Sequence, residues 1–105
     1  MREKEYFKYL SEFQNDRLRL KIKTGGGKVV DMVVQYETKV EGHWKPVVRY
    51  DCSHGFFQRD AIYPSGDKEK KAIPIEDLDA ALTYAEQDIR GRWEFYREKH
   101  KRPKK

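Results

Sequence analysis

Cysteine and histidine are scarce in this sequence: Cys52 is the one cysteine among 105 residues, and there are three histidines. One cysteine cannot form an internal disulfide or supply the cysteine pair of a structural zinc site. The histidines show no HxH, HxxxH or HExxH spacing, so we expect neither a metal nor another cofactor. No apolar run approaches the roughly 20 residues that a membrane helix needs, and the N-terminus lacks the apolar stretch of a signal peptide. These absences predict a cytoplasmic protein without membrane attachment.

Charged and aromatic residues are abundant by contrast, at 39% and 13% of the chain. Disordered chains of high charge are usually poor in aromatics, so the composition predicts one packed domain over residues 1–105. The net charge is +5 and it is segregated: residues 17–71 carry +5, residues 72–92 carry −3 and residues 93–105 carry +4. This distribution permits a nucleic-acid partner without requiring one.

The first segment is predicted to be a short helix. Over residues 2–14, Tyr6, Leu10 and Phe13 recur at the i, i+4, i+7 spacing of an amphipathic helix. From Arg17 onward the period changes to two, which is typical of a β-strand. The alternating stretches predict four antiparallel strands in a meander, and residues 68–73 are a candidate for a short fifth strand.

A long C-terminal helix is predicted from Pro74, because apolar residues recur every three or four positions as far as Tyr96. Gly91 is the one residue that conflicts with this helix, at a cost of about 1 kcal/mol relative to alanine. Residues 98–105 are strongly basic and are expected to form a frayed tail. The predicted fold is therefore α+β, with the long helix packed on one face of the sheet.

The densest group of chemically capable residues lies between residues 49 and 60, around one predicted turn. Tyr50, Asp51 and His54 precede the turn or lie in it, and Arg59 follows it. His54 is a candidate general acid or base that Asp51 would orient, and Arg59 is a candidate phosphate ligand. In the alternative interpretation these groups are structural, with Asp51 accepting backbone hydrogen bonds in the turn. Both interpretations stay open at this point.

A cationic strand face is the candidate nucleic-acid surface. Alternation places four basic side chains on one side of residues 17–23, namely Arg17, Arg19, Lys21 and Lys23. Such a face can follow a phosphate backbone, with Arg49 added from the next part of the sheet. It can equally be an ordinary solvent-exposed face or a means of protecting a sheet edge.

The segment from Val47 to Asp60 resembles a group of uncharacterised small prokaryotic proteins that share an "RYD…HG…RD" core. More distantly it resembles the TumE family of toxin–antitoxin components, which carry "RYDN…G…H" before a C-terminal helix. Cys52 stands where that family usually has asparagine, and residues 58–60 stand where it has a histidine-rich stretch. The resemblance implies a prokaryotic protein that acts on RNA or binds it, with a DNA-binding antitoxin as partner.

These observations lead to two hypotheses about function. In the first, the protein is a TumE-like toxin–antitoxin component, and the catalytic version makes it a metal-independent ribonuclease that uses His54, Asp51 and Arg59, with Tyr50 beside them. In the alternative, it is a non-catalytic domain that binds a protein or a nucleic acid.

Overall fold

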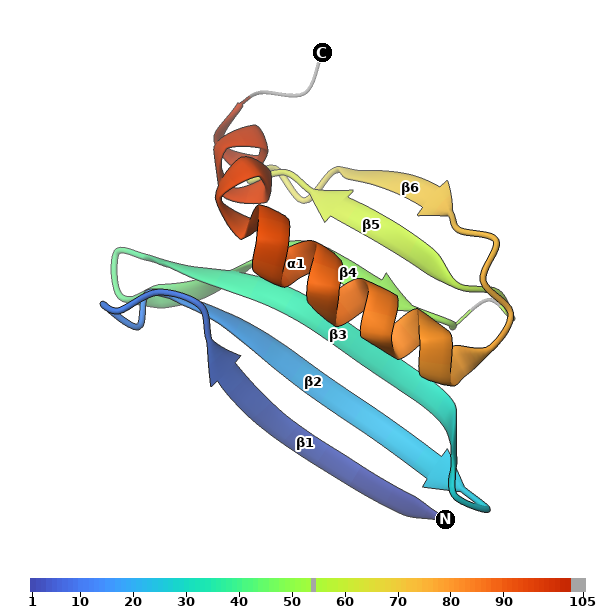
Figure 1. Ribbon diagram of the computed structural model, residues 1–105. Coiled ribbons are helices and arrows are strands. Elements are labelled where there is room, and N and C mark those ends of the chain that lie inside the picture. Colours follow the sequence, from blue (N-terminus) through green and yellow to red (C-terminus); the bar gives the residue numbers. More distant parts are fainter. Residues whose placement is uncertain (54, 103–105) are drawn as a thin grey trace.

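The fold is one antiparallel sheet with a single long helix across one of its faces (Figure 1). The computed structural model describes residues 1–53 and 55–102. Each strand pairs with its neighbours in sequence, so the sheet order is β1-β2-β3-β4-β5-β6. The strands are β1 (Arg2–Tyr9), β2 (Asp16–Gly25), β3 (Lys28–Val40), β4 (His43–Asp51), β5 (Gln58–Ile62) and β6 (Lys68–Ala72). The helix is α1 (Leu78–Lys101). The predicted α+β class and meander are confirmed.

The predicted N-terminal helix is wrong, because residues 2–9 form the edge strand β1. Tyr6 pairs with Leu20 of β2 and is half-buried, whereas its neighbour Phe7 is exposed. An isolated helix of three turns would be marginal in water, whereas pairing with β2 gives every second backbone group a partner. Together with β6, this strand brings the sheet to six strands instead of the four or five expected.

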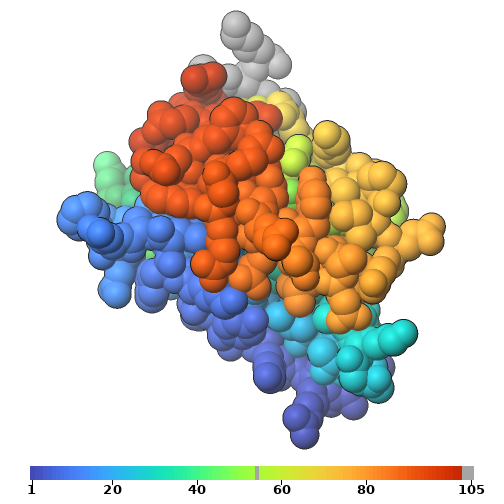
Figure 2. Space-filling model, in the orientation of Figure 1, coloured from blue at the N-terminus to red at the C-terminus, as the bar shows by residue number. Residues whose placement is uncertain are grey.

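The core lies between the sheet and α1. Apolar side chains on one face of β2, β3 and β4 pack against small and aromatic residues of the helix, and Figure 2 shows α1 covering the middle of this face. The sheet contributes Leu18, Leu20, Val34, Tyr36, Val48 and Tyr50, and the helix contributes Ala81, Ala85, Ile89 and Tyr96. Alanine at two helix positions lets the helix axis approach the sheet closely.

The helix begins later and ends later than the sequence indicated. It begins at Leu78, with Asp77 as the N-cap accepting a hydrogen bond from the backbone N–H of Asp79 at 3.1 Å, so Pro74 lies outside its first turn. It continues to Lys101, and His100 is buried with its Nδ1 2.5 Å from the carbonyl oxygen of Ile62. The expected fraying therefore does not begin at residue 98, and residues 103–105 lie outside the described part of the chain.

The other face of the sheet is covered by no helix within the described residues, and we call it the open face. Strand alternation places the odd-numbered residues of β2 and β3 on it, and the pairing of Gln35 with Arg49 extends it to β4. From β4 the registers Arg49 with Asp60 and Asp51 with Gln58 extend it to β5. No helix in the described part of the chain is long and apolar enough to cross a membrane.

Candidate nucleic-acid interface

The open face carries the four basic residues of β2 that the sequence singled out. Arg17, Arg19, Lys21 and Lys23 alternate with Leu18, Leu20 and Ile22, which face the helix. Their side chains project from the same face of the sheet because alternate residues of a strand point to the same side. The sequence-predicted cationic face therefore exists as a row of basic groups on the surface that α1 leaves uncovered.

Three of the predicted binding residues meet in one hollow of the open face, which we call the cationic hollow. It has a volume of about 200 Å³ and is lined by Arg19, Lys21, Val33, Gln35 and Arg49. Its cations come from β2 and β4, which lie on either side of β3. A hollow with three basic groups around Val33 and Gln35 can bind an anion such as a phosphate.

Three acidic residues of β3, β4 and β5 lie deeper in the open face than its basic residues, whereas Glu3 and Glu5 of β1 are 52% and 41% exposed and stand 3.4 Å from Lys21 and Arg19. The side chains of Glu37, Asp51 and Asp60 are only 4–8% exposed. The side chains of Arg19, Lys21 and Arg49 are 40–51% exposed. Each of these three carboxylates also forms an ion pair with a neighbouring basic side chain, namely Arg17, Arg49 or Lys70. Basic side chains therefore outnumber acidic ones in the exposed layer of this face, where Lys21 and Arg19 stand beside Glu3 and Glu5.

Aromatic side chains lie beside the cationic hollow on the same face. The guanidinium of Arg17 stands 4.3 Å from the ring centre of Phe7 and 3.9 Å from that of Trp44. Its Nε also donates a 2.8 Å hydrogen bond to Glu37. Arg17 is therefore less available to a ligand than Arg19 or Lys21, which are more exposed and whose ion pairs are longer, at 3.4 Å. Phe7 is itself exposed. Flat rings beside basic groups are the elements that proteins use to stack bases and hold phosphates.

Asp51 organises the turn that follows β4. Its Oδ1 accepts hydrogen bonds from Gln58 Nε2 at 3.0 Å and from the Ser53 hydroxyl at 3.1 Å, and its Oδ2 accepts one from Arg49 Nε at 2.8 Å. Burial acts to raise the pKa of Asp51, but these bonds outweigh it and hold the pKa below its ordinary value. A buried carboxylate with a lowered pKa stays ionised, so Asp51 is suited to positioning Arg49.

Tyr50 and Arg59 lie on the opposite side of the sheet from Asp51. They pair with each other across β4 and β5 and face the helix. Tyr50 donates a 2.6 Å hydrogen bond to Asp88 of α1, and Arg59 Nη1 donates one of 3.2 Å to the hydroxyl of Tyr96. Burial, followed by the hydrogen bond to Asp88, raises the pKa of Tyr96 to about 12 and raises that of Tyr50 further. Both tyrosines are therefore protonated, and they tie α1 to the sheet in different ways: Tyr50 donates to Asp88, whereas Tyr96 accepts from Arg59.

Among the described residues, the structure therefore does not bring Asp51 together with Tyr50 and Arg59. Asp51 and Arg59 are separated by the sheet itself, because they occupy positions of opposite parity in the β4–β5 register. Arg59 does not lie beside Arg49 either, since Arg49 pairs with Asp60. His54 lies outside the described residues. Among the described residues, no group of three histidine, cysteine or acidic side chains is placed to hold a metal ion.

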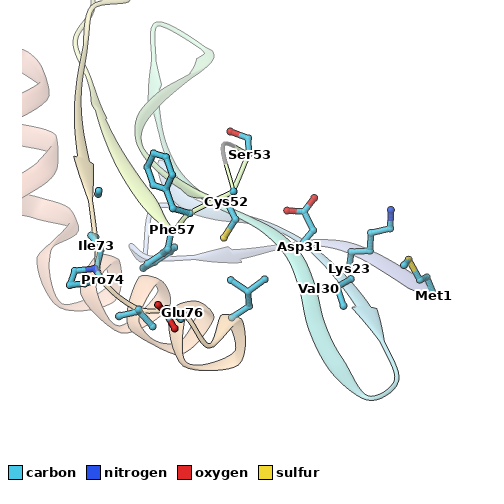
Figure 3. Close-up of a pocket in the computed structure, with 15 residues that line it drawn as sticks. Met1, Lys23, Val30, Asp31, Cys52, Ser53, Phe57, Ile73, Pro74 and Glu76 are labelled. Atoms are coloured by element: carbon cyan, nitrogen blue, oxygen red, sulfur yellow. The ribbon is translucent and has the colours of Figure 1, made fainter.

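Sequence reasoning missed a larger hollow at one end of the sheet, which we call the end pocket (Figure 3). It has a volume of about 980 Å³ and lies between the β2–β3 hairpin, the residues after β4 and the connection from β6 to α1. Apolar groups form much of its lining, namely Val30, Cys52, Phe57, Ile73, Pro74, Ile75 and Leu78. These residues come from three distant segments, so no local motif could have revealed their association.

Comparison with known proteins gives a family and no activity. No curated protein and no solved structure matches the chain. These findings do not bear on the resemblance to TumE, which stays a prediction. The family described as "Domain of unknown function (DUF7718)" matches residues 1–105, and the chain therefore belongs to this family.

Proposed function

We propose that the protein binds single-stranded RNA on the open face of its sheet. The observation that carries this proposal is the cationic hollow, in which Arg19, Lys21 and Arg49 converge from two strands. Neutralising phosphates with such groups releases counterions, which supplies much of the affinity of nucleic-acid complexes. The choice of RNA over DNA follows from the resemblance to the TumE family.

A single strand suits this surface better than a duplex does. The described residues of the open face form a sheet surface on which Phe7 and Trp44 lie beside the basic row. Unstacked bases can lie on exposed rings while the backbone follows the cations, and several RNA-binding sheets work in this way. Bases in a duplex are stacked on each other and are not available to such rings.

Binding is favoured over the catalytic hypothesis because of the sheet parity described above. Asp51 holds Arg49 on the open face, whereas Arg59 faces the helix and contacts Tyr96. The proposal therefore uses Arg49 and the β2 cations as ligands of the RNA backbone and assigns Tyr50 and Arg59 to the support of the fold. The toxin–antitoxin setting and the DNA-binding antitoxin partner stay predictions from the resemblance.

Fluorescence anisotropy with a labelled RNA of about 12 nucleotides tests this function. The two informative variants are Lys21→Gln on the open face and Lys45→Gln, which removes an exposed lysine of β4 on the opposite face, where it pairs with Thr38 after the register shift in β3. Lys21→Gln should weaken binding and reduce the slope of log affinity against log salt by about one, while Lys45→Gln should leave both unchanged. Matched single-stranded DNA and double-stranded RNA should bind more weakly. Absence of RNA binding by the wild type, or equal effects of the two variants, would show that the proposal is wrong.

A further inference from the structure

We infer that the end pocket receives an unstacked base of the RNA strand whose backbone lies on the open face. This inference rests on the proposed function and deepens it, because it names the part of the ligand that the pocket binds. The pocket is distinct from the cationic hollow in both its lining and its place in the fold.

A third depression lies between the end pocket and the cationic hollow and shares lining residues with each of them. This depression has a volume of about 170 Å³ and is lined by Glu3, Lys21, Lys23, Asp31, Met32 and Val33. It shares Lys21 and Val33 with the cationic hollow, and it shares Lys23 and Asp31 with the end pocket. A strand held at Arg49 and Lys21 therefore has a hollowed path along β2 and β3 that leads past Lys23 into the end pocket.

The chemistry of the end pocket fits a base and does not fit a phosphate. Lys23 is the only basic side chain among the described residues that line it, and Lys23 also borders the third depression, at the side from which the strand would enter. Apolar side chains of Val30, Phe57 and Leu78 offer surfaces against which a flat ring can pack. Asp31, Ser53 and Glu76 supply polar groups of the kind that ligand pockets use to orient a bound molecule. The volume of about 980 Å³ leaves ample room for a base and its ribose.

Cys52 provides a built-in reporter of this pocket. It is the one cysteine in the sequence, and Figure 3 shows its sulfur directed into the space between Phe57 and the β2–β3 hairpin. Burial, with the nearby charges of Asp31 and Asp51, raises the pKa of the thiol. The thiol is therefore mostly protonated near neutral pH, which makes its alkylation slow enough to follow by hand.

The experiment measures the rate at which iodoacetamide alkylates Cys52 with and without the same single-stranded RNA. With free RNA at about ten times the Kd measured by anisotropy, mass action leaves roughly one site in eleven empty, so the rate should fall about tenfold. An unchanged rate under conditions where anisotropy shows saturation would overturn the inference while leaving the proposed function intact. No RNA binding in either assay would overturn both. Alkylation of glutathione in the same RNA solution controls for effects on the reagent.

Two substitutions to tryptophan provide a second and independent test. Val30 and Val40 are exposed to a similar extent near opposite ends of β3, but only Val30 lines the end pocket. Val30→Trp should fill part of the pocket and raise the Kd for RNA at least about fivefold, the value of losing one stacked base, with the salt slope unchanged. Val40→Trp should bind as the wild type does. Circular dichroism of both variants checks that they are folded, and equal affinities of two folded variants would contradict the inference.

Discussion

Replacing Asp51 by alanine should lower the free energy of unfolding by about 2–4 kcal/mol. The carboxylate is buried and holds three neighbours, Gln58, Ser53 and Arg49. Gln58 is buried as well, and its amide would be left without this acceptor, which costs about 1–3 kcal/mol. Ser53 is exposed and the side chain of Arg49 is 40% exposed. Water can replace Asp51 as the partner of these two groups, so they add only about 1 kcal/mol.

The pH dependence follows from the lowered pKa of Asp51. Because the folded state favours the ionised carboxylate, its stabilisation is fully present above the ordinary value of 3.8 and is lost as the pH falls through the lower pKa of the folded state. The variant Asp51→Asn cannot ionise at this position. The stability difference between wild type and Asp51→Asn should therefore be constant near neutral pH and should shrink as the solution is acidified below about pH 4.

Urea unfolding at several pH values, followed by tryptophan fluorescence and circular dichroism, measures both effects. Asp67→Ala, in the exposed turn between β5 and β6, is the matched control and should change stability by less than about 0.5 kcal/mol. The double variant Asp51→Ala, Gln58→Ala should lose less than the sum of the two single variants, because it leaves no buried amide unpaired. A loss below about 1 kcal/mol in Asp51→Ala, or strict additivity in the cycle, would refute this account of the turn.

Two further predictions concern the fold. Gly91→Ala should raise the free energy of unfolding by about 1 kcal/mol, because Gly91 is exposed within α1 and an added methyl group would meet no atom within 4 Å. Gly42→Ala, where φ is +81°, should instead lower it by about 1 kcal/mol, and a thermal melt distinguishes the two signs. Asp16→Ala should lower the free energy of unfolding in urea by about 3–5 kcal/mol. The buried carboxylate of Asp16 accepts hydrogen bonds from the hydroxyls of Tyr36 and Thr38 at 2.5 and 2.8 Å, and both would lose their acceptor. A loss under about 1 kcal/mol would contradict this prediction.

The sequence predicted the sheet and the long helix because their periodicity is unambiguous, and it failed where two periods compete. In residues 2–14, Tyr6 and Leu10 fit a helix, but Glu3 and Glu5 also alternate with Lys4 and fit a strand. Glu3 and Glu5 stand within 3.4 Å of Lys21 and Arg19 in the structure. Residues 2–9 form a strand because the edge of β2 offers backbone groups with which they can pair, and β2 lies outside this segment. Local propensity contains no information about such an edge.

The candidate site was partly predictable for a related reason. Once the strands are assigned, the sequence predicts that basic and apolar side chains alternate along β2. It also predicts that Arg49 and Asp51 share one face of β4. The end pocket does not, because Cys52, Leu78 and Val30 meet only through the return of the chain from β6 to α1. The closeness of Arg49 to Arg19 likewise depends on the order of three strands in the sheet, which the meander establishes.

The tripeptide Arg49-Tyr50-Asp51 shows how one short stretch can serve both faces of a sheet. Its central residue points to α1, where Tyr50 stacks on Phe57 with ring centres 5.3 Å apart and donates to Asp88. Its outer residues point to the open face, where the buried carboxylate of Asp51 fixes the guanidinium of Arg49 at the cationic hollow. Replacing Tyr50 should therefore affect stability first and RNA affinity only through unfolding, whereas Arg49→Ala should reduce affinity with little loss of stability. The predicted catalytic group would need Tyr50 and Asp51 on one side of the sheet, whereas alternation along β4 places them on opposite sides.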